Sequence, residues 1–320
     1  MNTYSPGHAF AALGRHGPLV LVLSLISGMA MPTLAVGAHA ILPVSAFLLT
    51  LGSFLTAGLS PQEDAVCVRL SLVAVAWAGL GVPLLIAAGL MLVHFGADTQ
   101  SGVLLSVLAP PVGSAAAIAA MLGWQPRLAL IVSIALTILA PFSMPLIAKT
   151  LEIDVTIDMY FIARRLTLII GAAGATAAIA LRWRKQTSWI IPNNGAAAGV
   201  AVLGLVIVGL ATTDGIRASW RMDANLFVEY AVAAVSINVA ITLLSAALFS
   251  ATGFKNACTI GLVSGNRNVT LAWAATGGTL STFTEAYIAA CVIPILSLPL
   301  IIKSGFALLK ILRARRLVTP

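Results

Sequence analysis

Ten runs of about twenty predominantly apolar residues constrain this chain more than any other feature of its sequence. An α-helix rises about 1.5 Å per residue, so about 20 residues span the ~30 Å hydrocarbon layer of a bilayer. We therefore expect an all-α membrane protein with ten transmembrane helices. The expected spans cover residues 18–35, 38–59, 68–93, 103–122, 128–148, 166–181, 195–212, 226–251, 256–276 and 286–306.

Charged side chains are scarce, at 9% of 320 residues, whereas apolar residues make up 60%. A soluble domain carries about a quarter charged residues, so most of this surface is expected to face the lipid bilayer. The net charge of +8 resides mainly at the ends of the apolar runs, which indicates topology and not nucleic-acid binding. Cys67, Cys258 and Cys291 lack metal-ligand spacing, so we expect neither a metal site nor disulfides.

The basic residues favour both termini in the cytoplasm, because cytoplasmic loops are enriched in lysine and arginine. With the N-terminus inside, twelve basic residues fall in inner segments and five in outer ones. The protein is then expected to be a multi-pass protein of the inner (plasma) membrane. The inner set is Arg15, Arg69, Arg127, Arg182, Arg184, Lys185, Lys255, Lys303, Lys310, Arg313, Arg315 and Arg316, and the outer set is Lys149, Arg164, Arg165, Arg217 and Arg221.

An internal repeat divides the chain into two halves. The segment SMPLIAK at 143–149 recurs as SLPLIIK at 297–303, with five identities in seven residues at an offset of 154. Each copy closes a block of five spans, so we expect repeats at 1–155 and 156–320. Because five is odd, the second block enters the membrane upside down, as in inverted-repeat carriers.

The same offset aligns two helix-breaking stretches, 110–113 in the fourth span and 264–267 in the ninth. Pro110 and Pro111 remove backbone donors, and Gly113 and Gly265 favour unwound turns. A membrane tolerates free backbone groups only where protein or a water-filled cavity satisfies them. Breaks at equivalent positions therefore predict a binding site near the middle of the membrane.

Several motifs, in this order and spacing, resemble the bile acid:sodium symporter family. The resemblance covers about residues 18–306 and is strongest in the fourth, fifth and ninth spans. The motifs are Pro83, Pro111-Val112-Gly113-Ser114, Leu139-Ala140-Pro141, Pro145, Gly265-Asn266-Arg267-Asn268 and Leu271-Ala272.

The resemblance implies a panel domain of helices 1, 2, 6 and 7 and a core domain of helices 3–5 and 8–10. The fourth and ninth helices would cross where they unwind. Members of this family bind an organic anion in the cleft between the domains and, where they are sodium-coupled, two sodium ions behind the crossing. The expected function is transport of a small organic anion by alternating access.

The chain departs from the family at the positions that would bind sodium. Ala116 and Ala117 replace a Ser-Asn pair, Val263 replaces a glutamate, and Arg267 replaces a glutamine. Sodium prefers hard oxygen ligands, and a guanidinium has only donors. Both sodium sites are therefore expected to be degraded, and no cofactor is expected.

Arg267 is the one basic residue deep in an apolar span. Because a charge inside the bilayer is costly, we expect it either to meet the anionic substrate or to bridge carbonyls freed by the broken helix. The other candidate substrate-binding residues offer hydrogen bonds near the breaks. They are Asn266, Asn268, Thr270, Ser114 and Asn238.

Three other interpretations stay open at the sequence level. A sodium-independent or proton-coupled carrier of this fold is nearly as well supported as a sodium symporter with an altered site. A membrane sensor that has lost transport is less well supported. An enzyme is the poorest interpretation, because the spans contain neither paired carboxylates nor a Ser/His pair. Substrate identity, direction of transport and oligomeric state are not assigned.

Overall fold

The computed structural model describes residues 6–59, 67–93, 96–151, 159–187 and 189–316, and these residues fold into helices joined by short turns. The expected repeat boundary at 155/156 and both chain ends lie outside this part of the chain. The helices are α1 (Pro6–Arg15), α2 (Gly17–Ala30), α3 (Pro32–Ala40), α4 (Leu42–Leu59), α5 (Val68–Ala76), a π-helix (Trp77–Gly81), α6 (Val82–Leu92), α7 (Ala97–Leu108), α8 (Ala115–Met121), α9 (Pro126–Thr150), α10 (Met159–Arg182), α11 (Arg184–Thr187), α12 (Asn194–Met222), α13 (Ala224–Leu248), a 3₁₀ turn (Ser250–Thr252), α14 (Phe254–Gly265), α15 (Val269–Thr276) and α16 (Thr282–Arg316).

Six helical stretches in the described residues are long and apolar enough to cross a membrane. They are α4, α5 to α6, α9, α10 (from Tyr160), α12 and α13, and α1 with α2 becomes a seventh if this pair, bent by 88°, is one span. The fold is therefore all-α with six to seven candidate spans, which indicates a multi-pass membrane protein. The expected fourth and ninth spans are each divided into two short helices, and the count of ten stays a prediction.

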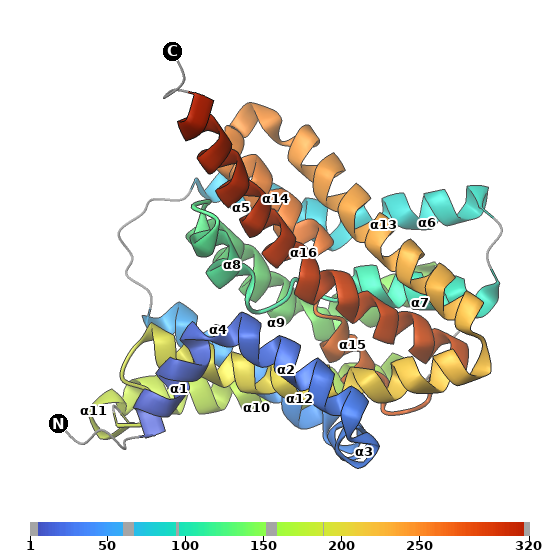
Figure 1. Cartoon of the computed structure of the whole chain (residues 1–320), viewed down its shortest axis with the longest axis horizontal. Coiled ribbons are helices and arrows are strands. Elements are labelled where there is room, and N and C mark those ends of the chain that lie inside the picture. The colour runs from blue at the N-terminus through green and yellow to red at the C-terminus, as the bar shows by residue number, and fades with distance from the viewer. Residues whose placement is uncertain (1–5, 60–66, 94–95, 152–158, 188, 317–320) are drawn as a thin grey trace.

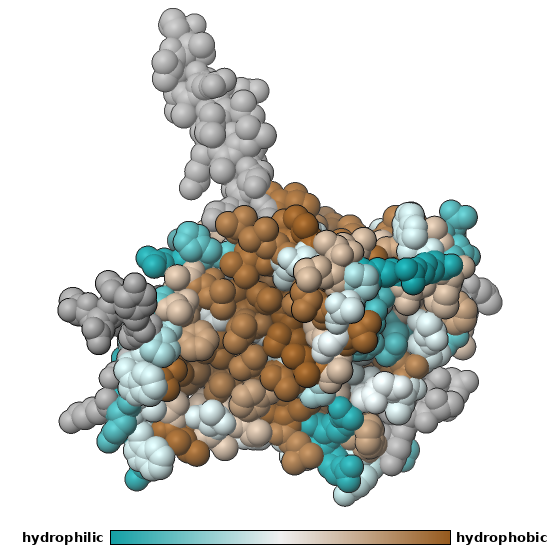
Figure 2. Space-filling model, turned by 60° about the horizontal axis from the view of Figure 1, so that its bottom comes forward, coloured by the Kyte–Doolittle hydropathy of each residue, from teal (hydrophilic) through white to brown (hydrophobic). Residues whose placement is uncertain are grey.

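The surface fits a membrane environment. Figure 2 shows a broad hydrophobic area with hydrophilic residues gathered along its two sides. Large apolar side chains such as Leu72, Met91 and Phe142 are more than 60% exposed. Exposed apolar area of this extent is unfavourable in water and favourable against lipid.

The helices form two groups. In Figure 1, α1 to α4 and α10 to α12 lie together in the lower half, and α13 to α16 lie above them with α5 to α8. Small residues allow the long helices of the lower group to approach closely: a Cβ added to Gly52 of α4 would lie 2.7 Å from the Ala201 nitrogen of α12, and one added to Gly204 would lie 2.8 Å from the Ser45 oxygen. Such contacts are typical of helix packing in membranes.

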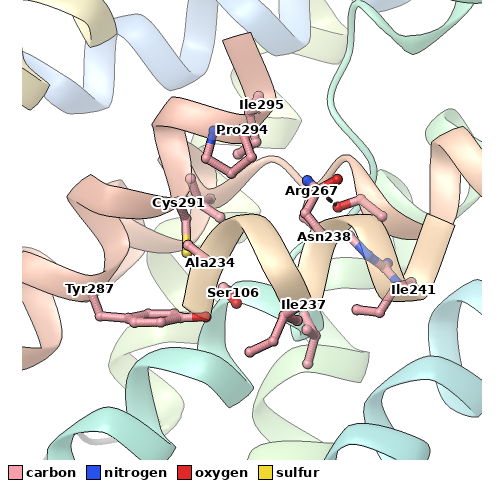
Figure 3. Close-up of a pocket in the computed structure, with 13 residues that line it drawn as sticks. Ser106, Ala234, Ile237, Asn238, Ile241, Arg267, Tyr287, Cys291, Pro294 and Ile295 are labelled. Carbon is pink, nitrogen blue, oxygen red and sulfur yellow. Dashed lines mark hydrogen bonds between the residues drawn. The ribbon is translucent and has the colours of Figure 1, made fainter. Parts of the chain in front are cut away.

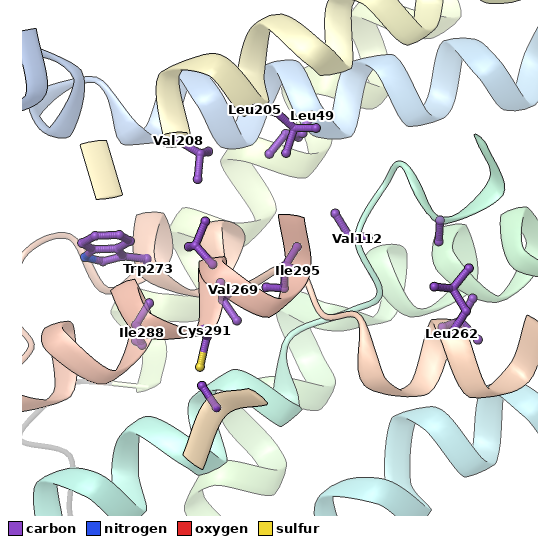
Figure 4. Packing of buried hydrophobic residues seen from close by; sticks show 14 of the residues in the cluster. Leu49, Val112, Leu205, Val208, Leu262, Val269, Trp273, Ile288, Cys291 and Ile295 are labelled. Carbon is purple, nitrogen blue, oxygen red and sulfur yellow. The ribbon is translucent and has the colours of Figure 1, made fainter. Parts of the chain in front are cut away.

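The interface between the two groups is filled mainly by apolar side chains. Leu49, Leu205 and Val208 of the lower group face Val269 and Ile295 of the upper group (Figure 4). This packing holds α4 and α12 against the segments where the interrupted helices meet.

Candidate functional site

Two interruptions of the helical backbone lie at the centre of the upper group. The chain is non-helical at 109–114, between α7 and α8, and at 266–268, between α14 and α15. α7 ends before Pro110 because a proline disfavours helical dihedrals in the preceding residue. Ala109 accordingly has ψ of 143°, and Asn266 leaves the helix with ψ of 88°.

The two interruptions pair with each other as a single antiparallel β-bridge between Pro111 and Arg267. The amide of Val112 donates to the Asn266 carbonyl (2.9 Å), and the amide of Asn268 donates to the Pro110 carbonyl (2.7 Å). Each unwound segment thus satisfies backbone groups that the other has lost from its helix, which is necessary in a water-free layer.

The Arg267 guanidinium binds three carbonyls from three different segments. Its Nε donates to Ser264 in α14 (2.7 Å), one terminal nitrogen donates to Ala109 after α7 (3.3 Å), and the other donates to Ala78 in the π-helix (2.7 Å). Arg267 is 4% exposed, and no carboxylate among the described residues lies within ion-pairing distance of it. The C-terminal carbonyls of two helices therefore supply the negative partial charge that faces this cation.

The third carbonyl is free because of Pro83. In the π-helix the Val82 amide donates to the Trp77 oxygen, five residues back. In that register the amide of residue 83 would donate a hydrogen bond to the Ala78 oxygen, but proline has no N–H. Pro83 thus leaves the Ala78 carbonyl without a donor from its own helix, and the Arg267 guanidinium donates to it instead.

The other candidate residues are divided among several places around the crossing. The Asn238 amide donates to the Gly265 carbonyl (3.0 Å), and the Asn268 side chain accepts from the Leu271 amide (3.2 Å) as the N-cap of α15. Both side-chain polar atoms of Asn266 are buried without a hydrogen-bond partner. Thr270 is 5% exposed beside Arg267 and Asn268.

The cavities next to Arg267 are small. One of about 20 Å³ is shared with Asn238 and Tyr287 (Figure 3), and one of about 10 Å³ is shared with Asn268 and Thr270. The first volume suits a single water molecule, and neither can admit an organic anion. Substrate binding by these residues stays a prediction.

A larger cleft, of about 340 Å³, lies between the two groups of helices. α8 and the 109–114 break line one side, with Gly113 and Ser114, and α1, α2, α4 and α12 line the other. Ala116 and Ala117 also face it and bring no polar side-chain group. A cleft of this size falls in the range of small-molecule sites.

Among the residues that the structure describes, Arg15 at the end of α1 is the only charged one that lines this cleft. Among the described residues it has no hydrogen-bond or ion-pair partner, and the Ser114 hydroxyl has none either. From the sequence, Arg15 was expected to contribute to topology only, because nothing in the local pattern predicts that α1 packs against α12 and α2. A cation in a mostly apolar cleft favours an anion.

No protein-family model matches the chain, and no curated protein matches it. The resemblance noted from the sequence therefore stays a prediction. No group of three or more His, Cys, Asp or Glu in the described residues lies together in a way that could hold a metal ion.

Proposed function

We propose that this protein is a secondary transporter that carries a small organic anion by alternating access. The observation that carries the proposal is the backbone pairing of the two interrupted helices, with a cleft of about 340 Å³ beside one of them. Unwound backbone at membrane depth is costly unless it is satisfied internally, and carriers use such segments to build their binding sites.

The proposed architecture is that of the bile acid:sodium symporter family, with ten spans in an inverted five-plus-five repeat. α7 with α8 would be the fourth span and α14 with α15 the ninth. The lower group in Figure 1 would be the panel domain, and the upper group with α9 would be the core domain. Both termini would be cytoplasmic, which places the Arg15 cleft on the inner side of the membrane.

The substrate class follows from the cleft lining. Most lining residues are apolar, whereas Arg15 supplies one cation and Thr56 and Ser114 each supply one hydroxyl. An amphipathic carboxylate or sulfonate matches this arrangement, because its apolar body displaces water and its anionic group pairs with the guanidinium.

Coupling to sodium is disfavoured by the position of Arg267. Three carbonyls that could coordinate a cation already accept hydrogen bonds from its guanidinium. We propose that this fixed cation holds the crossing together without an exchangeable ion. A sodium-independent or proton-coupled carrier therefore replaces the sodium symporter as the better supported function. A non-transporting sensor is the remaining alternative.

Purified protein tests the proposal directly. Carboxylates and sulfonates would be screened for thermal stabilisation in potassium buffer, and each stabilising ligand would be retested in sodium buffer. We expect stabilisation by at least one amphipathic anion, equal in the two buffers. Sodium alone raising the melting temperature at millimolar concentration would show that the coupling assignment is wrong. Ligands that stabilise the protein but never enter proteoliposomes would favour the sensor.

A further inference from the structure

Another cavity at the crossing, of about 230 Å³, lies among α13, α14 and α16. It shares no described lining residue with the Arg15 cleft. Its polar side chains are Asn238 and Thr242 of α13 and Asn266 of the second break, and the rest of its described lining is aliphatic. No charged side chain is part of that described lining, so the cavity is chemically different from the cleft.

The Asn266 side chain has hydrogen-bonding capacity that no other part of the described chain uses. Its oxygen accepts no hydrogen bond, its nitrogen donates none, and the residue is 4% exposed. A buried amide without hydrogen bonds destabilises a fold, so an amide of this kind beside a cavity indicates a binding partner. That partner must donate to the oxygen and accept from the nitrogen.

The Thr242 hydroxyl offers a second hydrogen bond at the same cavity. Threonines inside other membrane helices donate to the carbonyl four residues earlier, as Thr137 and Thr212 do at 2.7 Å. Within the described part of the chain, Thr242 makes no such bond. Asn238, four residues before it on the same face of α13, donates to the Gly265 carbonyl (3.0 Å) and holds this face beside the break.

The cavity borders the outer surface of α13. Leu243 lines it and is 64% exposed. α13 is one of the helices that are long and apolar enough to cross a membrane, so this exposed side is expected to face lipid. A ligand then enters the cavity from the hydrocarbon layer and not from water.

The lining restricts the class of ligand. An ion would lose its hydration without gaining a counter-ion. The volume corresponds to about seven water molecules, each of which needs two or more polar partners, whereas the described wall offers three polar side chains. A quinone or ester carbonyl accepts hydrogen bonds but cannot donate to the Asn266 oxygen. A hydroxyl group both donates and accepts, and an attached alkyl chain would cover the aliphatic wall.

We propose that this cavity binds a neutral aliphatic alcohol from the bilayer. The hydroxyl group of the alcohol pairs with the Asn266 amide, and its alkyl chain lies against the aliphatic side chains of α13, α14 and α16. The inference goes beyond the proposed transport function, because this ligand is uncharged and the Arg15 cleft favours an anion.

A photoreactive diazirine analogue of 1-octanol tests this site in the full chain, reconstituted in phosphatidylcholine nanodiscs. Mass spectrometry of proteolytic peptides would locate the covalent adducts. We expect adducts within residues 238–243 or 298–302, with a yield that falls at least about fivefold when excess 1-octanol is added. Octane at the same mole fraction in the bilayer should lower the yield less than about twofold, because it forms no hydrogen bond.

Two variants separate hydrogen bonding from filling of an apolar groove. Asn266→Leu keeps a side chain of similar size but removes the amide, and it should lower the adduct yield at least about fivefold. Thr242→Val should lower it at least about twofold. Asn256→Leu is the matched control and should leave the yield unchanged: Asn256 lies ten residues earlier in α14, outside the cavity lining, and donates to the Thr252 carbonyl (2.9 Å).

Equal competition by octane and 1-octanol would overturn the proposal, because it would show a groove for any alkyl chain. The absence of adducts in both segments would overturn it as well, and so would equal yields from the wild type, Asn266→Leu and Thr242→Val. Each of these measurements reports binding alone. Their outcome is therefore independent of whether the protein transports an anion.

Discussion

Replacing Arg267 with alanine should destabilise the protein strongly, because the side chain joins three segments that no other described side chain connects in this way. The carbonyls of Ser264, Ala109 and Ala78 would lose their donor together. Two of them lie at the C-terminal ends of α14 and α7, so their partial charges would face one another without a cation between them.

The expected loss can be worked from these contacts. Three hydrogen bonds from a charged donor, at about 1.5–3 kcal/mol each, sum to about 5–9 kcal/mol. Removing the charge from the membrane interior recovers about 2.5–3.5 kcal/mol. Water that enters the vacated space offsets part of the remaining loss of stability. We therefore expect the free energy of unfolding to fall by about 3 kcal/mol. Lysine should recover less than half of this loss, since one ammonium group cannot reach three diverging carbonyls.

Reversible unfolding in mixed micelles with sodium dodecyl sulfate, followed by circular dichroism, measures this loss. Arg217→Ala is the matched control: Arg217 also donates to two carbonyls, those of Gly28 and Met29 at the end of α2, but it is only half-buried. The control should cost about 1 kcal/mol or less, because water replaces the lost donor. Equal losses in Arg267→Ala and Arg217→Ala would refute the assignment of Arg267 as the cation that holds the crossing.

Three further predictions concern the same region. Pro83→Ala restores an amide in register with the Ala78 carbonyl. In a double-mutant cycle of unfolding free energies, it should reduce the destabilisation by Arg267→Ala by at least about 0.5 kcal/mol. Strictly additive effects of the two substitutions would contradict this. Arg15→Gln should weaken binding of a stabilising anion about tenfold or more in a thermal-shift titration, whereas Arg69→Gln, at an exposed position outside the cleft, should not. Exchange of sodium for potassium should leave the unfolding midpoint unchanged, and a sodium-dependent rise would indicate an intact sodium site.

The interruptions were predictable from sequence because they depend on local chemistry. The consecutive Pro110 and Pro111 remove two backbone donors and disfavour the helical turn before them, and the chain is non-helical there. Gly265 was expected to lie within the second break and is instead the last residue of α14. The close approach there needs a glycine for a different reason: a Cβ would lie 2.7 Å from the Asn238 carbonyl oxygen.

The partners of these segments were not predictable, because they depend on how distant helices pack. The sequence did not decide whether Arg267 contacts the substrate or bridges carbonyls. Only the fold brings the Ala78 carbonyl oxygen within 2.7 Å of the guanidinium. Asn266 was grouped with the substrate-binding residues, yet it lines a separate cavity of about 230 Å³ between α13, α14 and α16. Arg15 lines the cleft of about 340 Å³ beside the 109–114 break, although its own segment indicated only a role in topology.

Counterflow in proteoliposomes tests the central claim most directly. Vesicles loaded with a high concentration of an anion found by thermal shift would be diluted into trace labelled anion, with potassium as the only alkali cation on both sides. We expect transient accumulation of label in vesicles with the wild-type protein and at least tenfold slower accumulation with Arg15→Gln. Accumulation that requires sodium, or no accumulation with any stabilising anion, would contradict the proposed sodium-independent transport.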